Sequence, residues 1–238
     1  MSVKSALDKV LATRTLEFPK ERRGYDPAER RQHLHDLMRH LFAESFWETE
    51  TAFVVECTHN LRPSATAADI DNVAKSLDIV VPEQLRQFWE ICDGAELFVA
   101  KCKGEETRYR DAVVCYDIRG TSDTGPKRWT GDRNVIDLTR YLFKNFRECL
   151  GDDPGFKDML KSNYIAFCDA YDGNNQAILL DGPEYGKVFM LHHEHTYCPH
   201  DEKDCILNDT LAPSFESWLR LLAETRGYGG RGVNVGSI

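Results

Sequence analysis

The sequence has 238 residues with 42% hydrophobic and 29% charged side chains, the balance of an ordinary soluble globular protein and not of a disordered one. No apolar run approaches the roughly 18 residues of a membrane span, and the first residues lack a secretory signal pattern, so we expect a cytoplasmic protein that does not bind membranes. The net charge of -9 argues against direct binding of nucleic acid.

The surplus of acidic residues lies in one third of the chain. Residues 151–225 contain fourteen acidic and five basic residues, whereas residues 1–50 contain nine of each. Because the local sign of charge steers association, this third favours a basic partner. A generic acidic surface, common among cytoplasmic proteins, is the alternative explanation.

The eight cysteines are spread through segments that have helix or strand patterns, and they are not closely paired. In a chain of this length, such spacing favours reduced thiols that fill the core over a disulfide framework.

The first part of the chain is predicted to be mainly helical. Apolar residues repeat with helical spacing in residues 2–14 and 27–47, and Pro27 suits the first turn of the second helix. A short run with β propensity, residues 52–57, follows. We therefore expect residues 1–62 to form an N-terminal helical extension packed on a core domain.

A pair of helices is predicted next. Thr66 and Asp69 have the spacing of a capping box at the start of the first helix. Val81-Pro82 ends that helix and begins the second, because proline fits the first turn of a helix but not its interior. Gly94 suits the left-handed conformation that ends the second helix. The predicted buried faces are Ile70, Val73, Ala74, Leu77, Leu85, Phe88, Trp89 and Cys92.

Five strands are predicted from β-branched and aromatic runs. Two of them, residues 97–100 and 112–116, are separated by a polar segment. The other three, residues 164–168, 176–181 and 187–191, are separated by turn residues, which favours an antiparallel meander.

Two further helices and a tail complete the predicted elements. The first helix has its apolar face at Leu138, Leu142, Phe146 and Cys149. The second begins at the cap Ser214 and has its apolar face at Phe215, Trp218, Leu219 and Leu222. Residues 226–238 are rich in glycine and are predicted to be a flexible tail.

Four motifs follow one another in the order of a known family. They are the helix-turn-helix segment 77–94, the strand, turn and acidic strand end 164–181, Gly186-Lys-Val-Phe189 and the helix start 214–219. In this order they resemble the SUKH superfamily, which includes bacterial toxin-immunity proteins and a fungal regulator of cell-wall synthesis. The resemblance implies an α+β domain over residues 63–225, with a mixed or antiparallel sheet backed by helices. Val81 and Asp93 stand where the family has leucine and asparagine, and both keep the turn chemistry.

The resemblance implies a protein-binding module that needs no cofactor and is not an enzyme. The expected function is that of an immunity protein, which neutralises a basic toxin domain such as a nuclease by direct binding. A regulatory scaffold in cell-wall or stress signalling is the alternative that the fungal branch implies. The candidate contacts are acidic residues near strand ends and a loop tryptophan: Asp169, Asp172, Asp181, Glu184, Glu194, Asp201, Glu202, Asp204 and Trp129.

Catalytic motifs are weak in this sequence. Two carboxylates near strand ends could meet as an acid/base pair, but turns also collect aspartate for their own hydrogen bonds. The sequence contains no Gly-x-Ser-x-Gly nucleophile elbow, no Walker loop and no dinucleotide-binding glycine pattern after a strand. Hydrolytic catalysis is therefore disfavoured.

A cluster of histidine and cysteine within residues 192–205 is the strongest alternative site. Imidazole and thiolate are the ligands that zinc prefers. The spacing matches neither paired Cys-x-x-Cys nor His-Glu-x-x-His, so we expect no metal and keep a zinc-binding domain or zinc-dependent hydrolase as the alternative. The candidate ligands are His193, His195, Cys198, His200 and Cys205.

Overall fold

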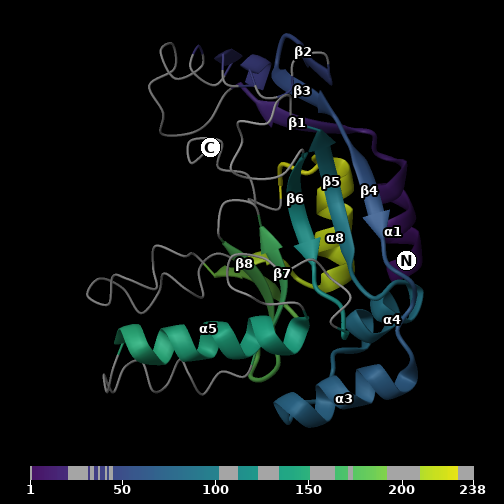
Figure 1. Cartoon of the computed structure of the whole chain (residues 1–238), viewed down its shortest axis with the longest axis vertical. Coiled ribbons are helices and arrows are strands. Elements are labelled where there is room, and N and C mark those ends of the chain that lie inside the picture. Colours follow the sequence, from purple (N-terminus) through teal and green to yellow (C-terminus); the bar gives the residue numbers. More distant parts are fainter. Residues whose placement is uncertain are drawn as a thin grey trace.

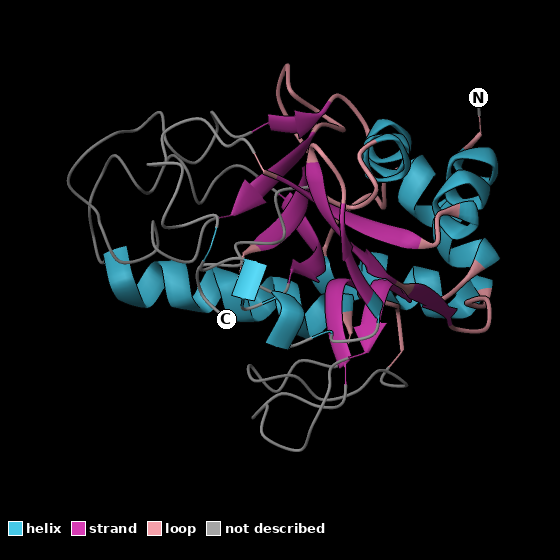
Figure 2. Cartoon of the chain, turned by 90° about the horizontal axis from the view of Figure 1, so that it is seen from above, coloured by secondary structure: helices cyan, strands magenta, loops and turns pink. Residues whose placement is uncertain are grey.

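The computed structural model shows an α+β protein, as the sequence predicted (Figure 1). Its strands form two antiparallel sheets, whereas the sequence had suggested one. The strands occupy the centre of the molecule, with helices around them (Figure 2). The described residues are 2–20, 32, 35–36, 38–40, 42, 45–101, 112–122, 134–150, 164–170, 174–191 and 210–229.

The larger sheet has seven strands in the order β10-β9-β8-β7-β6-β5-β4. They are β4 (Thr58–Leu61), β5 (Ala95–Lys101), β6 (Ala112–Ile118), β7 (Tyr164–Ala170), β8 (Asn175–Leu179), β9 (Val188–Leu191) and β10 (Thr210–Ala212). Each strand pairs with the next one along the chain, and all six pairings are antiparallel. The predicted meander of β7, β8 and β9 is therefore confirmed.

A second, three-stranded sheet lies in the N-terminal part, in the order β1-β3-β2. Its strands are β1 (Thr15–Pro19), β2 (Phe46–Glu48) and β3 (Ala52–Glu56). The sequence had suggested a helical extension over residues 1–62, but this region also contains the three strands of the second sheet. The described positions between residues 32 and 42 are helical, but residues 46–48 pair with β3 because the turn after them brings the two segments together. One residue after β3, the chain enters the larger sheet as β4.

Five predicted helices are confirmed: α1 (Val3–Ala12), α3 (Ala67–Leu77), α4 (Glu83–Ile91), α5 (Val135–Leu150) and α8 (Phe215–Glu224). Thr66 and Asp69 form the predicted capping box at the start of α3. Ser214 caps α8, and α1 packs on α8 and α4. None of the helices in the described ranges is both long and apolar enough to cross a membrane.

The main core lies between the larger sheet and α8. The ring of Trp218 meets Phe167 edge to face at 5.1 Å between centroids and Tyr116 at 5.8 Å. Phe215 and Phe88 are packed in the same way at 5.3 Å, which joins α8 to α4. Each such pair adds about 0.5–1.5 kcal/mol beyond the burial of its area. The motif aromatics therefore fill the core, as their helical spacing predicted.

A smaller apolar cluster covers the other face of β7 and β8. Residues of β7 alternate between the two clusters: Ile165 belongs to the main core and Tyr164 to the smaller one. Tyr164 stacks on Phe143 of α5 at 4.5 Å between ring centroids. The hydroxyl of Thr139 donates to the carbonyl oxygen of Ala166 and accepts a hydrogen bond from the N–H of the same residue. In consequence, α5 and α8 lie on opposite faces of the sheet.

The first residues of the predicted tail pack against the body. The hydroxyl of Tyr116 donates to the carbonyl oxygen of Gly227 at 2.5 Å, and Arg226 pairs with Glu17 of β1. Gly227 has φ +86°, and a Cβ there would lie 2.7 Å from the side chain of Leu16. This close approach requires glycine. Residues 230–238 lie outside the described residues.

His59 joins the end of α1 to strands β4 and β5. Its Nε2 lies 2.8 Å from the carbonyl oxygen of Thr13, and its Nδ1 accepts a hydrogen bond from the N–H of Phe98 at 3.2 Å. Phe98 has a left-handed φ of 54° where the pairing of β4 and β5 shifts register. Because a carbonyl group only accepts, this geometry requires the neutral imidazole with its proton on Nε2.

Folding stability is expected to fall as the pH drops below the ordinary histidine value of 6.5. Burial lowers the pKa of His59, as does the charge of Arg14, whereas the hydrogen bond to Thr13 opposes them. Between the two pKa values the unfolded state therefore binds more protons than the folded state. The stability that neutral His59 contributes to the fold is complete above the ordinary pKa and is lost as the pH falls through the lowered folded-state pKa.

Urea unfolding of the wild type and of His59→Gln, at about pH 8 and about pH 5, measures this dependence. The variant should lose less stability on acidification than the wild type. Equal losses in the two proteins would contradict the assignment.

Candidate functional site

A row of polar side chains crosses the larger sheet from β4 to β8. Each member is the direct register partner of the next, and such partners point to the same face of an antiparallel sheet. In β5 and β6 the residues before and after these positions belong to the main core, so the row lies on the face opposite α8. This polar row consists of Asn60, Glu96, Asp117, Asp169 and Asn175.

Two arginines neutralise the middle of the polar row. Nη2 of Arg62 donates to Oδ1 of Asp117 at 2.9 Å. Nη1 of Arg119 lies 3.2 Å from the other oxygen of Asp117, and its Nη2 donates to Oδ2 of Asp169 at 3.2 Å. Asp117 is thus held between two guanidinium groups, and Arg119 links β6 to β7.

The centre of this network is removed from water. The side chain of Arg119 is 0% exposed and that of Asp117 is 2% exposed, whereas Asp169 keeps 23%. A buried charge is tolerated only when it is paired, because isolated ions lose their hydration without compensation. Glu96, at the outer part of the row, is only half-buried and accepts a hydrogen bond from Asn60 at 3.0 Å.

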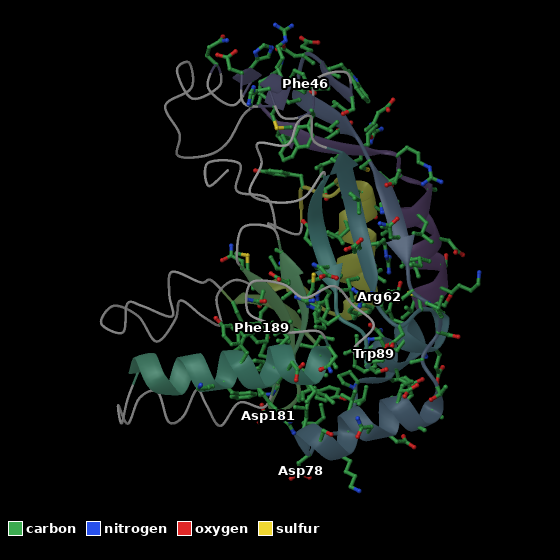
Figure 3. The ribbon with its side chains drawn as sticks, viewed as in Figure 1. Phe46, Arg62, Asp78, Trp89, Asp181 and Phe189 are labelled. Atoms are coloured by element: carbon green, nitrogen blue, oxygen red, sulfur yellow. The ribbon has the colours of Figure 1, made fainter. Side chains whose placement is uncertain are left out.

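The end of α4 positions Arg119. Buried Asp93 accepts hydrogen bonds from the N–H of Thr121 and from the hydroxyl of Ser122, the latter at 2.6 Å. The indole N–H of Trp89 donates to the carbonyl oxygen of Arg119 at 3.1 Å. Helix α4 is therefore joined by three hydrogen bonds to the segment that follows β6. Arg62 and Trp89 are labelled in this region in Figure 3.

Two glycines allow these segments to touch. Gly94 has φ +99°, and a Cβ there would lie 2.5 Å from Nη1 of Arg62 and 2.7 Å from the carbonyl oxygen of Ile118. A Cβ at Gly120 would lie 2.2 Å from the carbonyl oxygen of Asp93. The sequence predicted that Gly94 ends α4, but α4 ends with Cys92 as an extended cap, and Gly94 instead permits the close approach of Arg62.

The network is built for structure and not for acid/base chemistry. Both oxygens of Asp117 already face a guanidinium group, so this carboxylate is held in a structural ion pair. Burial raises the pKa of the neighbouring Cys92 thiol to about 12, and the charge of Asp93 adds to this, so the thiol is not activated. Cys57, Cys92 and Cys168 are buried thiols that are not in disulfides, as expected for core cysteines.

Three of the predicted contact residues lie within the described chain, and they do not form one cluster. Asp169 belongs to the polar row, at the Asn175 end of β8. Asp181 and Glu184 lie in the turn after the other end of β8, roughly 20 Å away at the usual rise of a strand. The remaining predicted contacts lie outside the described residues: Asp172, Glu194, Asp201, Glu202, Asp204 and Trp129.

The candidate zinc ligands also lie outside the described residues: His193, His195, Cys198, His200 and Cys205. Within the described part of the chain, no three His, Cys, Asp or Glu side chains are grouped as metal ligands would be.

Sequence reasoning missed Arg62, Asp117 and Arg119. The available signal was Asp117, a single acidic residue that directly follows an apolar strand run in β6. A buried aspartate needs a cation or hydrogen-bond donors to compensate its charge. Its partner Arg62 lies 55 residues earlier, and no local pattern indicates such a pairing.

The comparison with protein-family models matches residues 64–221 to the SMI1 / KNR4 family (SUKH-1), which is more than half of the chain. The chain belongs to this family. The resemblance to the SUKH superfamily is thereby confirmed. A comparison with curated proteins found no significant match.

The SMI1 / KNR4 match includes α3 through most of α8, and therefore Trp89, Asp93 and Arg119. Arg62 and β4 lie before the matched region. Residues outside the match therefore supply an edge strand of the larger sheet and the guanidinium group that pairs with Asp117. Asp93 stands where the family has asparagine. Here a carboxylate suits the position, since both of its oxygens accept hydrogen bonds.

Proposed function

We propose that the chain is a non-catalytic binding module that neutralises a basic toxin domain, such as a nuclease, as an immunity protein does. Its family, SMI1 / KNR4, is generally non-catalytic, which supports binding over chemistry. The proposal assigns no cofactor, and the bound protein blocks the toxin's active site or substrate groove by covering it.

The observation that carries the proposal is the segregation of charge. The fourteen acidic and five basic residues of 151–225 give this third a strongly negative field, whereas residues 1–50 are balanced. Such a field accelerates encounter with a basic protein and disfavours acidic partners.

The described carboxylates divide into two roles under this proposal. Asp169 is bound to Arg119 and helps to hold β6 against β7. Glu184 is exposed in the turn between β8 and β9, where only Lys187 of the described residues pairs with it, so it is available to a partner. The network therefore provides rigidity, and exposed acidic residues provide the contacts.

Neutralising acidic residues of this third of the chain is expected to slow association with the toxin. The variant carries Asp172→Asn, Asp201→Asn, Glu202→Gln and Asp204→Asn, and the binding probe is the toxin-like domain that we expect a neighbouring gene to encode. We expect the association rate at low salt to fall about tenfold and its dependence on salt to flatten, because steering by charge is lost. Stopped-flow mixing at several salt concentrations measures both.

The matched control neutralises four exposed acidic residues outside this third: Asp8, Glu50, Glu56 and Asp71. It should leave the association rate within about twofold, since it removes the same charge from another region. If both variants associate at the wild-type rate, the acidic third does not steer binding.

A further inference from the structure

The two most exposed large apolar side chains of the described residues lie in two turns. Val80 is 81% exposed in the turn between α3 and α4, and Tyr185 is 53% exposed in the turn between β8 and β9. Figure 3 labels Asp78 and Asp181, the first residues of these turns, at the same end of the molecule's long axis. Exposed apolar side chains gathered at one place are typical of protein interaction sites.

Both turns flank the junction of β10 and α8. Val188, which follows the β8–β9 turn, is the register partner of Ala212 in β10. At the start of α8, the N–H of Glu216 donates to Oε1 of Gln84, near the beginning of α4, at 2.9 Å. The junction thus contacts the residue that directly follows each turn, Val188 and Gln84. We call residues 78–83 and 181–187 the two-turn surface.

The two-turn surface is held rigidly by its own backbone. In the β8–β9 turn, the N–H of Gly186 donates to the carbonyl oxygen of Leu179 at 2.8 Å, and Gly182 and Gly186 both have positive φ, +68° and +84°. In the other turn, Asp78 has φ 54°, and its N–H donates to the carbonyl oxygen of Ala74. Preorganised side chains lose little conformational entropy on binding.

The charge around these apolar side chains is acidic. The two-turn surface contains four carboxylates and one ammonium group, that of Lys187, which pairs with Glu184. The carboxylates are Asp78, Glu83, Asp181 and Glu184. Protein interfaces commonly place apolar anchors at the centre and charged groups at the rim. The arrangement therefore fits a partner surface that has apolar pockets surrounded by lysine and arginine.

We infer that the two-turn surface is the docking site for the basic domain, with Val80 and Tyr185 as its apolar anchors. This inference rests on the proposed function, since the partner is the same. It adds where the partner sits: on the end of the molecule formed by α3, α4 and the β8–β9 turn, away from the polar row.

The test uses the full chain and the purified toxin domain encoded beside its gene. Tyr185→Ala should raise the Kd by about tenfold or more, Val80→Ser by about fivefold, and the double variant further, as expected when interface anchors are removed. The matched controls are Leu61→Ala and Trp47→Ala, which remove side chains that are 41% and 40% exposed elsewhere on the surface. They should change the Kd by less than about twofold.

The outcomes separate the two proposals. If the wild type binds and only the two-turn variants weaken binding, the docking site is supported. If the wild type binds and all five variants bind as well as it does, the docking site is wrong while the proposed function stands. If the wild-type chain does not bind the toxin domain, the proposed function fails, and the inference fails with it.

Discussion

Replacing Arg119 with methionine is expected to lower the free energy of unfolding by about 3–5 kcal/mol. Arg119 is fully buried and is the guanidinium that joins Asp117 to Asp169. Methionine fills similar space but removes the cation that Asp117 and Asp169 share, while Asp117 keeps its pair with Arg62. The loss comes mainly from carboxylate charge that is left partly uncompensated away from water. Denaturation by urea, followed by circular dichroism, measures it.

Two comparisons isolate the charge effect. Adding Asp169→Asn to Arg119→Met should recover part of the lost stability, because the uncompensated anion is removed while Asp117 keeps Arg62. Lys4→Met breaks an exposed pair with Asp8 in α1 and should cost less than about 0.5 kcal/mol. If Arg119→Met is as mild as Lys4→Met, the network does not stabilise the fold.

Replacing Trp89 with alanine is expected to cost about 3–5 kcal/mol of unfolding free energy. The side chain is 0% exposed in the main core, so its loss opens a large cavity beneath the end of α4. The carbonyl oxygen of Arg119 also loses the indole N–H that donates to it. Thermal and urea unfolding of the purified variant measure the change.

Trp89→Phe separates packing from hydrogen bonding, because it keeps most of the ring and removes only the donor. Its stability should lie between those of the wild type and Trp89→Ala. Trp47→Ala is the matched control, since this tryptophan is 40% exposed on β2, and it should cost less than about 1 kcal/mol. Equal losses at the two tryptophans would rule out a special role for Trp89.

The expected stability changes bear on function because the residues that stabilise the fold and the residues proposed to bind the partner lie in different parts of the molecule. The buried network joins α4, β4, β6 and β7 on one face of the sheet. The two-turn surface lies at one end of the molecule, and its two anchors Val80 and Tyr185 are 81% and 53% exposed. Variants of Val80 and Tyr185 are therefore expected to fold normally, and any effect on binding is then a direct one.

Much of the fold was predictable because its signals are local. The capping box at Thr66, the proline turn at Pro82 and the apolar stripes of α4 and α8 each depend on residues within a few positions of one another. The meander of β7 to β9 was predictable for the same reason, since turn residues separate apolar runs.

The candidate contacts were only partly predictable. Asp169 was identified as an acidic residue near a strand end, but the sequence did not show that Arg119 binds it. Asp181 and Glu184 were placed in the same predicted set, yet the strand β8 separates them from Asp169. Composition shows how many charges a segment has, but strand pairing decides which of them meet.

By itself, the sequence determined the helices, the main strands, the family and the acidic character of the C-terminal third, because all of these depend on short-range patterns or on composition. Only the tertiary structure decided that residues 46–48 are a strand and that Arg62 reaches Asp117. Both depend on partners that are distant in the chain or joined by a particular turn. A buried ion pair forms where the fold brings opposite charges together away from water, and that proximity is set by the register of the whole sheet.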